Sequence, residues 1–316
     1  MTGVIREVER IEILTLQDNY IDITAMDNSS VVARAFPLKE GQLKESILAE
    51  HGFSVVVKTT EGGRTRTMLF DFGFSEYGAA ANATTLAVDM KQVEAAALSH
   101  GHIDHWGGMK ELMALTGRKA VPFVVHPAVF RSPRYLKANE GRIDLPALTR
   151  DQVRQARLDV IETIEPYSLL DGSVLFLGEI SRTTDFEKGF PVAYFRENGN
   201  EKPDPTEDDT AIVMNLRDKG LVIVSGCAHS GIINTIRYAM KVTGIQAVYL
   251  VMGGFHLSGP LFAPMIERTI EELKRLNPTY LVPAHCTGHK AIAIMERELP
   301  KQFILNMAGT ILRVPA

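Results

Sequence analysis

Four side chains that can bind a metal ion lie within six consecutive residues, His100-Gly101-His102-Ile103-Asp104-His105. A short apolar run over 95–98, with the character of a β-strand, precedes them, and apolar residues at helical spacing follow over 106–115. The alternative is a solvent-exposed loop that happens to be rich in histidine, because short motifs produce false matches. Few such loops lie between a strand and a helix, so the pattern predicts a metal site at a strand end.

The spacing divides the four side chains into two pairs. Residues two apart on an extended chain point the same way, so His100 and His102 are expected to bind one ion through their imidazole nitrogens. Asp104 and His105 lie where the chain turns into the helix, and neighbouring residues diverge there. This second pair is better placed to hold a second ion, because the ions of two-metal hydrolytic sites lie about 3.5–4 Å apart.

Three further histidines, His229, His256 and His285, each follow a strand-like run in the last third of the chain. Small or kink-permitting residues separate each histidine from its strand, at 225–226, 253–254 and 283–284. Glycine, which occurs in two of these pairs, permits the close backbone approach that a crowded ion cluster requires. We expect the three histidines to converge on the first motif.

The motif and the segment Leu69-Phe70-Asp71-Phe72-Gly73, a strand ending in a structural Asp, resemble the metallo-β-lactamase fold superfamily. The segments 225–232, 253–257 and 283–288 are similar to one of its branches, named after dihydropterin ribofuranosylaminobenzene phosphate synthase. The resemblance covers most of the chain. It implies an α/β fold of the αββα sandwich type, with two mixed sheets packed face to face and helices outside, and a single domain over 1–316.

The resemblance also implies roles for the late histidines. A catalytic Zn²⁺ takes three protein ligands plus water. By analogy with the superfamily, His229 completes the first ion and His285 completes the second. His256 is then left over, and we expect it beside the substrate as a hydrogen-bond donor or proton carrier. A metal-ligand role for His256 is the alternative.

Cys227 departs from the superfamily pattern, in which most dinuclear members supply a bridging Asp after the comparable strand. A thiolate in that position favours Zn²⁺ over the harder Mn²⁺. Alternatively, Cys227 is a small buried residue, and the bridge is a hydroxide alone or comes from Asp208 or Asp209. We expect one or two Zn²⁺ ions, with Mn²⁺ or Fe²⁺ as alternatives.

Composition excludes several other classes of protein. The net charge of −4 and the lack of a Lys/Arg cluster give no basis for nucleic acid as a partner. No apolar run approaches the roughly 20 residues that span a bilayer, and 1–10 has no apolar signal-peptide core. The two cysteines, Cys227 and Cys286, both lie in site segments rather than in a disulfide framework. A cytoplasmic protein without a membrane partner is expected, and its oligomeric state is open.

Two polar segments are expected to be loop insertions. The first, 131–150, is predicted to be irregular and solvated; in an alternative, Arg131, Arg134, Tyr135 and Lys137 form a cationic rim over the site. The second, 197–209, contains two prolines and no other apolar side chain, so we expect an exposed, lid-like loop.

Regular elements are expected elsewhere along the chain. Strands are predicted over 11–16, 121–125, 173–177, 211–216, 221–224, 247–252 and 280–282, with a hairpin formed by 53–58 and 67–71. Helices are predicted over 43–49, 148–158, 232–241, 260–276 and 290–299, and 79–86 is predicted to be either the start of a helix or a lid segment.

The leading functional hypothesis is a metal-dependent hydrolase that uses a metal-activated hydroxide on a small-molecule phosphoester or cyclic ester. Asp104 is expected to bind metal and orient the hydroxide, and His256 to protonate the leaving group. The branch name suggests a transferase that condenses a phosphoribosyl-type group with an aromatic amine. A non-catalytic metal-binding protein is the third hypothesis, against which the complete set of ligand types argues.

Overall fold

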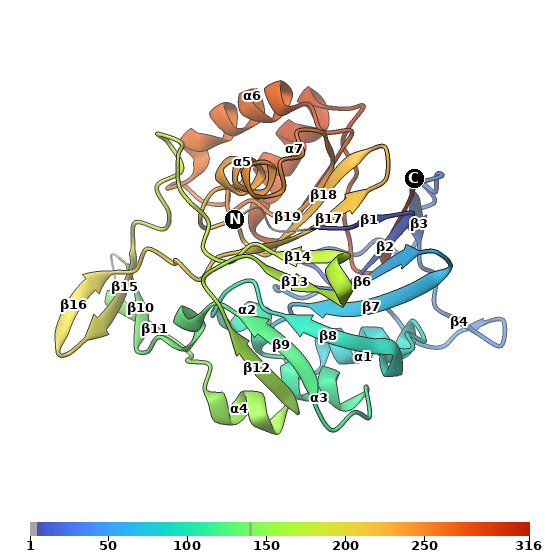
Figure 1. Ribbon diagram of the computed structural model, residues 1–316, viewed down its shortest axis with the longest axis horizontal. Coiled ribbons are helices and arrows are strands. Elements are labelled where there is room, and N and C mark those ends of the chain that lie inside the picture. Colours follow the sequence, from blue (N-terminus) through green and yellow to red (C-terminus); the bar gives the residue numbers. More distant parts are fainter. Residues whose placement is uncertain (1–4, 139–140) are drawn as a thin grey trace.

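The computed structural model describes residues 5–138 and 141–316, whose strands form two large mixed β-sheets packed face to face (Figure 1). Helices cover the outer face of each sheet, so the layers follow the order helix, sheet, sheet, helix. The predicted αββα sandwich is confirmed. The first few residues of the segment 1–10, judged above for a signal peptide, lie outside the described residues.

The first sheet comes mostly from the N-terminal half, in the order β12-β9-β8-β7-β6-β2-β21-β3. The predicted hairpin is present, because Gly62 and Gly63 take positive φ angles between β6 and β7. β7, β8, β9 and β12 run parallel, so their carboxyl ends meet at one edge. The bounds are β2 Arg10–Gln17, β3 Val32–Arg34, β6 Ser54–Glu61, β7 Arg64–Phe70, β8 Val93–Ala97, β9 Val121–Val125, β12 Leu158–Glu162 and β21 Thr310–Pro315.

The second sheet has the order β13-β14-β17-β18-β19-β20, and β1 pairs with β17. β18, β19 and β20 are parallel to one another. They are covered on both faces, which explains their unbroken apolar runs. The bounds are β1 Glu7–Val8, β13 Tyr167–Leu169, β14 Val174–Phe176, β17 Ala211–Leu216, β18 Gly220–Ser225, β19 Val248–Gly254 and β20 Tyr280–Ala284.

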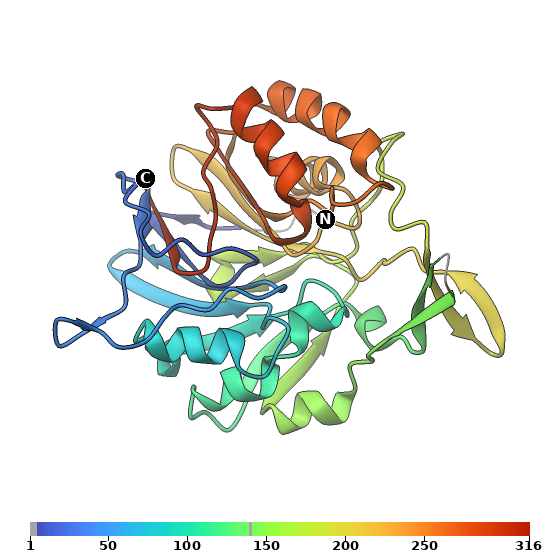
Figure 2. The same cartoon turned by 180° about the vertical axis from the view of Figure 1, so that it is seen from behind.

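Successive side chains along a strand point to opposite faces of the sheet. The apolar side chains are therefore divided between the core that separates the two sheets and the layers beneath the outer helices. On β6, Val55 and Val57 pack between the sheets against residues such as Met214, whereas Val56 faces the outer helices. Helices α1 to α4 cover the first sheet and α5 to α7 the second (Figures 1 and 2). Their bounds are α1 Gly78–Thr85, α2 Ile103–Trp106, α3 Met109–Ala114, α4 Arg150–Gln155, α5 Ile232–Thr243, α6 Ile266–Leu276 and α7 His289–Glu298. No helix of the described residues is both long and apolar enough to cross a membrane.

A four-stranded sheet, called the arm below, projects from the body of the molecule (Figures 1 and 2). It comprises β10 Arg134–Ala138, β11 Gly141–Leu145, β15 Ala193–Glu197 and β16 Asn200–Pro203. The prediction of irregular loops over 131–150 and 197–209 is therefore wrong for the residues in these strands, whereas 204–209 contains neither strand nor helix. The arm forms through antiparallel pairing of β10 with β15, in which Tyr135 lies opposite Tyr194, and no local pattern encodes this contact. Residues 139 and 140 lie outside the described residues.

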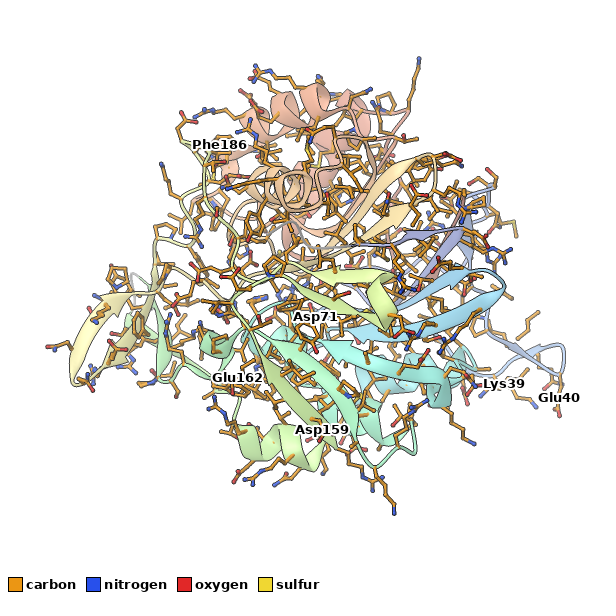
Figure 3. All side chains as sticks on the ribbon, in the orientation of Figure 1. Lys39, Glu40, Asp71, Asp159, Glu162 and Phe186 are labelled. Carbon is orange, nitrogen blue, oxygen red and sulfur yellow. The ribbon has the colours of Figure 1, made fainter. Side chains whose placement is uncertain are left out.

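The predicted helix over 43–49 is also wrong. Only a small hairpin forms nearby, from β4 Leu38–Lys39 and β5 Gln42–Leu43, with Lys39 and Glu40 at its projecting tip (Figure 3). The side chain of Asn82 bonds both backbone groups of Leu48, accepting from its N–H at 2.8 Å and donating to its carbonyl at 2.8 Å. These bonds replace those that a helix would make. The helix predicted over 148–158 is shorter, since Arg157 takes a φ of 61° before β12 begins.

Candidate metal centre

The predicted site residues converge where parallel strands of both sheets end. The first motif follows β8 of the first sheet, and His229, His256 and His285 follow β18, β19 and β20 of the second. The sandwich thus brings the two halves of the predicted site together. We call the side chains of His100, His102, Asp104, His105, Cys227, His229 and His285 the candidate metal centre.

One group in this centre comprises Asp104, His105, Cys227 and His285, whose ligand atoms all lie within 4.8 Å of one another. Nε2 of His285 lies 3.1 Å from Oδ2 of Asp104, and Nε2 of His105 lies 3.7 Å from the same oxygen. Nε2 of His105 also lies 3.2 Å from Sγ of Cys227. This group can hold one ion.

A second group comprises His100, Cys227 and His229, again within 4.8 Å. Nδ1 of His102 lies 3.0 Å from Nε2 of His100, and the ring centroids of His102 and His229 lie 4.8 Å apart. The three imidazoles therefore surround one point from three directions. Cys227 belongs to both groups, which places its sulfur between them.

A third group comprises Cys227, His256 and Cys286, whose ligand atoms also lie within 4.8 Å of one another. His256 therefore lies at the edge of the centre rather than apart from it. Its ring packs 4.2 Å from that of His229, centroid to centroid. Both roles considered for His256, beside the substrate and as a ligand, are compatible with this position. Cys286 was not predicted as a site residue, although it directly follows His285.

The carboxylate of Asp71, at the end of β7 in the interior of the molecule (Figure 3), organises the first motif. Its Oδ2 lies 2.6 Å from Nδ1 of His105 and accepts a hydrogen bond from Oγ of Ser99 at 2.7 Å. Its Oδ1 accepts from the Ser99 N–H at 2.7 Å. The bond to Nδ1 directs Nε2 of His105 toward Cys227, as carboxylates behind ligating histidines commonly do.

A second network positions His285. Asp18 accepts from the His285 N–H at 2.8 Å, and Oδ1 of Asn19 lies 3.1 Å from Nδ1 of the His285 ring. Nε2 of His51 lies 3.4 Å from Oδ2 of Asp104, on the outer side of the centre. Sequence reasoning missed these three residues as site residues. Asp18 and Asn19 carried only the signature of a turn, and His51 lay in a segment with no pattern.

The electrostatics keep several imidazoles in the neutral form that binds metal. Burial lowers the pKa of His100 and of His229 well below the usual range, and lowers that of His102 to about 4. Burial opposes ionisation of Asp104, but neighbouring imidazoles, above all His105, hold the pKa of its carboxyl well below normal. Burial likewise acts against a charged His105, yet Asp104 and Asp71 raise the pKa of that imidazole to about 9.

The side chains considered for the bridging position, Cys227, Asp208 and Asp209, differ in where they lie relative to the candidate metal centre. Cys227 is 2% exposed, and burial raises the pKa of its thiol. Asp208 accepts bonds from Arg134 and from the Gly101 N–H at 2.8 Å, so its oxygens are engaged outside the centre. Asp209 accepts from the Ser230 N–H at 2.8 Å. Neither aspartate belongs to the three groups, whereas Cys227 belongs to all of them.

Close backbone packing holds Cys227 in place. A Cβ on Gly226 would lie 2.1 Å from Oγ of Ser99, and one on Gly254 would lie 2.5 Å from Sγ of Cys286. Non-glycine residues here also take left-handed φ angles, 59° at Asp71 and 46° at both His256 and His285. Such strained backbone clusters at functional sites.

The donor set fits a transition-metal ion. Among the described residues, both ring nitrogens of His229 and Nδ1 of His256 are buried without a hydrogen-bond partner. Buried polar atoms normally have a hydrogen-bond partner. Imidazole nitrogens without a partner, beside a thiol and a carboxylate, are therefore typical of a site that binds a metal ion. Imidazole, sulfur and carboxylate donors together suit an ion of this kind.

A cavity of about 750 Å³ opens onto the centre. Its floor includes His102, Asp104, Cys227, His229 and His285. Its walls are mostly apolar and come from the arm, from the segment before β15 and from the loop after β19, with Leu136, Leu145, Phe190, Val192, Leu261 and Phe262 among the lining residues.

The alternative in which cations form a rim over the site is not found, because no lysine or arginine occurs among the described residues that line this cavity. Arg134 is 4% exposed and pairs with Asp204 and Asp208. Arg131 pairs with Glu207, and Lys137 with Glu201. Arg134 thus joins β10 of the arm to the segment 204–208, whereas the pair of Lys137 and Glu201 links two strands within the arm. That segment, predicted to be fully exposed, buries Asp204, Thr206 and Asp208.

Comparisons with known proteins agree with this geometry. A family model described as the metallo-beta-lactamase superfamily matches residues 49–239. The 7,8-dihydropterin-6-methyl-4-(beta-D-ribofuranosyl)-aminobenzene-5′-phosphate synthase of Methanocaldococcus jannaschii is 30% identical over 84% of this chain and 90% of its own length. Tm1679, described as a metal-dependent hydrolase of the beta-lactamase superfamily, superposes with a TM-score of 0.71 at 24% identity, covering 97% of this chain and 100% of that one. Unliganded yeast PDE1 shares the fold at 11% identity, with a TM-score of 0.54 over 98% of this chain and 100% of its own.

Proposed function

This chain belongs to the metallo-β-lactamase superfamily, and on that premise we propose that it is a metal-dependent hydrolase of a small cyclic ester or phosphoester. The observation that carries the proposal is the convergence of the seven side chains of the candidate metal centre beneath one cavity, five of which line its floor. Among the described residues, the ring nitrogens of His229 have no hydrogen-bond partner.

In this proposal, the residues divide between two ions. His100, His102 and His229 hold the first, and Asp104, His105 and His285 hold the second. The sulfur of Cys227 belongs to both groups and would help to hold either ion. Zn²⁺ suits the mixed nitrogen, oxygen and sulfur donors best.

Ions bound there supply a water molecule of lowered pKa and polarise the oxygen of the scissile group. The chain's own groups do the rest. Oδ2 of Asp104 lies close to the ring nitrogens of His285, His51 and His105. In this proposal it accepts a hydrogen bond from the attacking water and so orients it. His256 faces the cavity and donates a proton to the leaving oxygen. The apolar walls limit access of competing water.

Metal content by elemental analysis, combined with hydrolysis of chromogenic phosphodiesters and lactones, tests the proposal. We expect one to two transition-metal ions per chain and turnover that a chelator abolishes and added Zn²⁺ restores. His126→Asn is the matched control for ligand variants. His126 is buried outside the centre, and its Nδ1 accepts from the Ala128 N–H at 3.1 Å, which an Asn side chain can also do. A metal-loaded protein inactive on every ester class would overturn the hydrolase proposal.

A second candidate function is a synthase, which the 30% identity to the M. jannaschii enzyme favours. In such a condensation a dihydropterin unit would be joined to a ribofuranosylaminobenzene 5′-phosphate unit, the two parts that the name of that enzyme's product contains, with pyrophosphate taken as the leaving group. Mass spectrometry of the joined product, with a pyrophosphate assay, distinguishes this activity from hydrolysis. The apolar, cation-poor walls fit a substrate with several phosphate charges less well than a simple ester.

A further inference from the structure

We infer that the substrate carries an apolar body about the size of an aromatic ring beside its reactive group, and no charged group away from that reactive group. This inference rests on the proposed function, since it concerns the cavity over the same centre. The walls of the cavity would determine which substrates bind, whereas the candidate metal centre on its floor would carry out the reaction.

One wall is aromatic and begins at the candidate metal centre itself. The ring of Phe190 stacks on His229 at 5.9 Å and meets His256 edge-on at 5.0 Å. Phe262 meets His256 at 4.5 Å and Phe190 at 5.6 Å, centroid to centroid. Such edge and stacked arrangements favour a further aromatic or apolar group packed against them. A substrate whose reactive group lies on His229 therefore places its adjoining atoms against these rings.

The arm forms more of the wall. Leu136 on β10, Leu145 on β11 and Val192 before β15 line the cavity and are only partly buried. At the mouth, Leu261 is 47% exposed and Phe74 is 41% exposed. Apolar side chains left partly exposed around one concave surface are typical of a binding site for an apolar ligand. The cavity volume of about 750 Å³ lies within the range of small-molecule sites.

The charges support the same conclusion from the opposite side. Three cationic side chains in or beside the arm, Arg131, Arg134 and Lys137, are paired with carboxylates and do not line the cavity. A carboxylate or phosphate at a distance from the reactive group would lose water without gaining a lysine or arginine partner, which is unfavourable. An apolar body instead gains contact with the walls. The arm therefore selects against polyanionic substrates and for apolar ones.

Binding of phenylphosphonate and methylphosphonate to the metal-loaded protein, measured by calorimetry, tests this inference. Both ligands present the same phosphonate to the centre, and only one carries a ring. Burial of a ring-sized apolar group predicts at least about tenfold tighter binding of phenylphosphonate. Leu261→Ser should reduce this ratio several-fold. Leu43→Ser is the matched control, because Leu43 is 53% exposed on the β4–β5 hairpin and does not line the cavity.

The outcomes separate this inference from the proposed function. Equal binding of the two phosphonates, binding of neither, or an unchanged ratio in Leu261→Ser overturns the inference, whatever the turnover. Selective binding of phenylphosphonate by a protein that hydrolyses no ester supports the apolar subsite and counts against the hydrolase proposal alone. A ratio that falls equally in Leu43→Ser would show a general loss of structure and would also overturn the inference.

Discussion

Oδ2 of Asp71 lies 2.6 Å from Nδ1 of His105, and both side chains are fully buried. The carboxylate holds the imidazole so that Nε2 points at the candidate metal centre. Because Oδ2 also accepts from Ser99, a single oxygen fixes both His105 and the start of the first motif.

The first prediction follows from this contact. Asp71→Asn replaces one carboxylate oxygen by an NH₂ donor and should weaken Zn²⁺ binding by about 10–100-fold, the usual effect of losing a residue that orients a ligating histidine. Chelator competition measures the affinity. Asp159→Asn is the control, because Asp159 lies exposed on β12 at the outside of the molecule (Figure 3). Unchanged affinity in a folded Asp71→Asn protein would show that Asp71 does not position His105.

The second prediction concerns the buried pair of Arg134 and Asp208. The guanidinium donates to both oxygens of Asp208 at 2.9 and 2.7 Å, and Asp208 accepts from the Gly101 N–H between two predicted ligands. Arg134→Leu leaves a buried carboxylate without its cation and should lower the free energy of unfolding by about 3–5 kcal/mol. Urea denaturation measures the loss. The double variant with Asp208→Asn should recover part of it, and a double variant less stable than Arg134→Leu would refute the pairing argument.

The same pair predicts that the free energy of unfolding depends on pH in the acidic range. Burial opposes ionisation of Asp208, but Arg134 keeps the pKa of its carboxyl well below the usual range. A depressed folded-state pKa contributes stability that is complete above the unfolded-state value of about 3.9 and is lost as the pH falls toward the folded value. Asp208→Asn should therefore flatten the decline of unfolding free energy below about pH 4. A decline identical to that of the wild type would exclude the pair as a contributor.

The first motif and the late strand ends could be predicted from sequence because their geometry is local. Residues two apart on a strand end point together, and histidines after parallel strands meet at one edge, so His100, His102, His229 and His285 required no knowledge of the tertiary contacts. Asp71 followed from a family resemblance. The αββα layers followed from the alternation of strands and helices together with that resemblance.

The features that escaped prediction depend on contacts between distant segments. Asn19 meets His285 across 266 residues, and nothing near Asn19 signals that contact. The sequence around Arg134 is typical of an exposed cation. Its carboxylate partners, Asp204 and Asp208, lie more than sixty residues further along the chain. Charged and proline-containing segments form the arm because pairing with a distant strand outweighs their weak local preference.

His256 gives the next prediction. If it carries a proton to the leaving group, His256→Ala should keep its metal while the rate constant for hydrolysis falls by about 10²–10⁴-fold. Elemental analysis and single-turnover kinetics measure the two quantities separately. His126→Asn provides the comparison for a buried histidine outside the centre. Loss of metal from His256→Ala would instead make His256 a ligand, together with Cys227 and Cys286, which lie within 4.8 Å.

The last prediction concerns Cys227, whose sulfur belongs to all three candidate groups. A thiolate bound to divalent ions is protected from alkylation, and removal of the ions should expose it, whereas a merely buried thiol is shielded in both states as long as the fold survives. The Cys286→Ala background leaves Cys227 as the only thiol. Mass spectrometry should then detect alkylation of Cys227 only after chelation, in a protein whose circular dichroism is unchanged. Cys227→Asp should also shift metal preference toward Mn²⁺, since a carboxylate is a harder ligand. Equal alkylation with and without metal would remove Cys227 from the centre and leave the second ion to Asp104, His105 and His285.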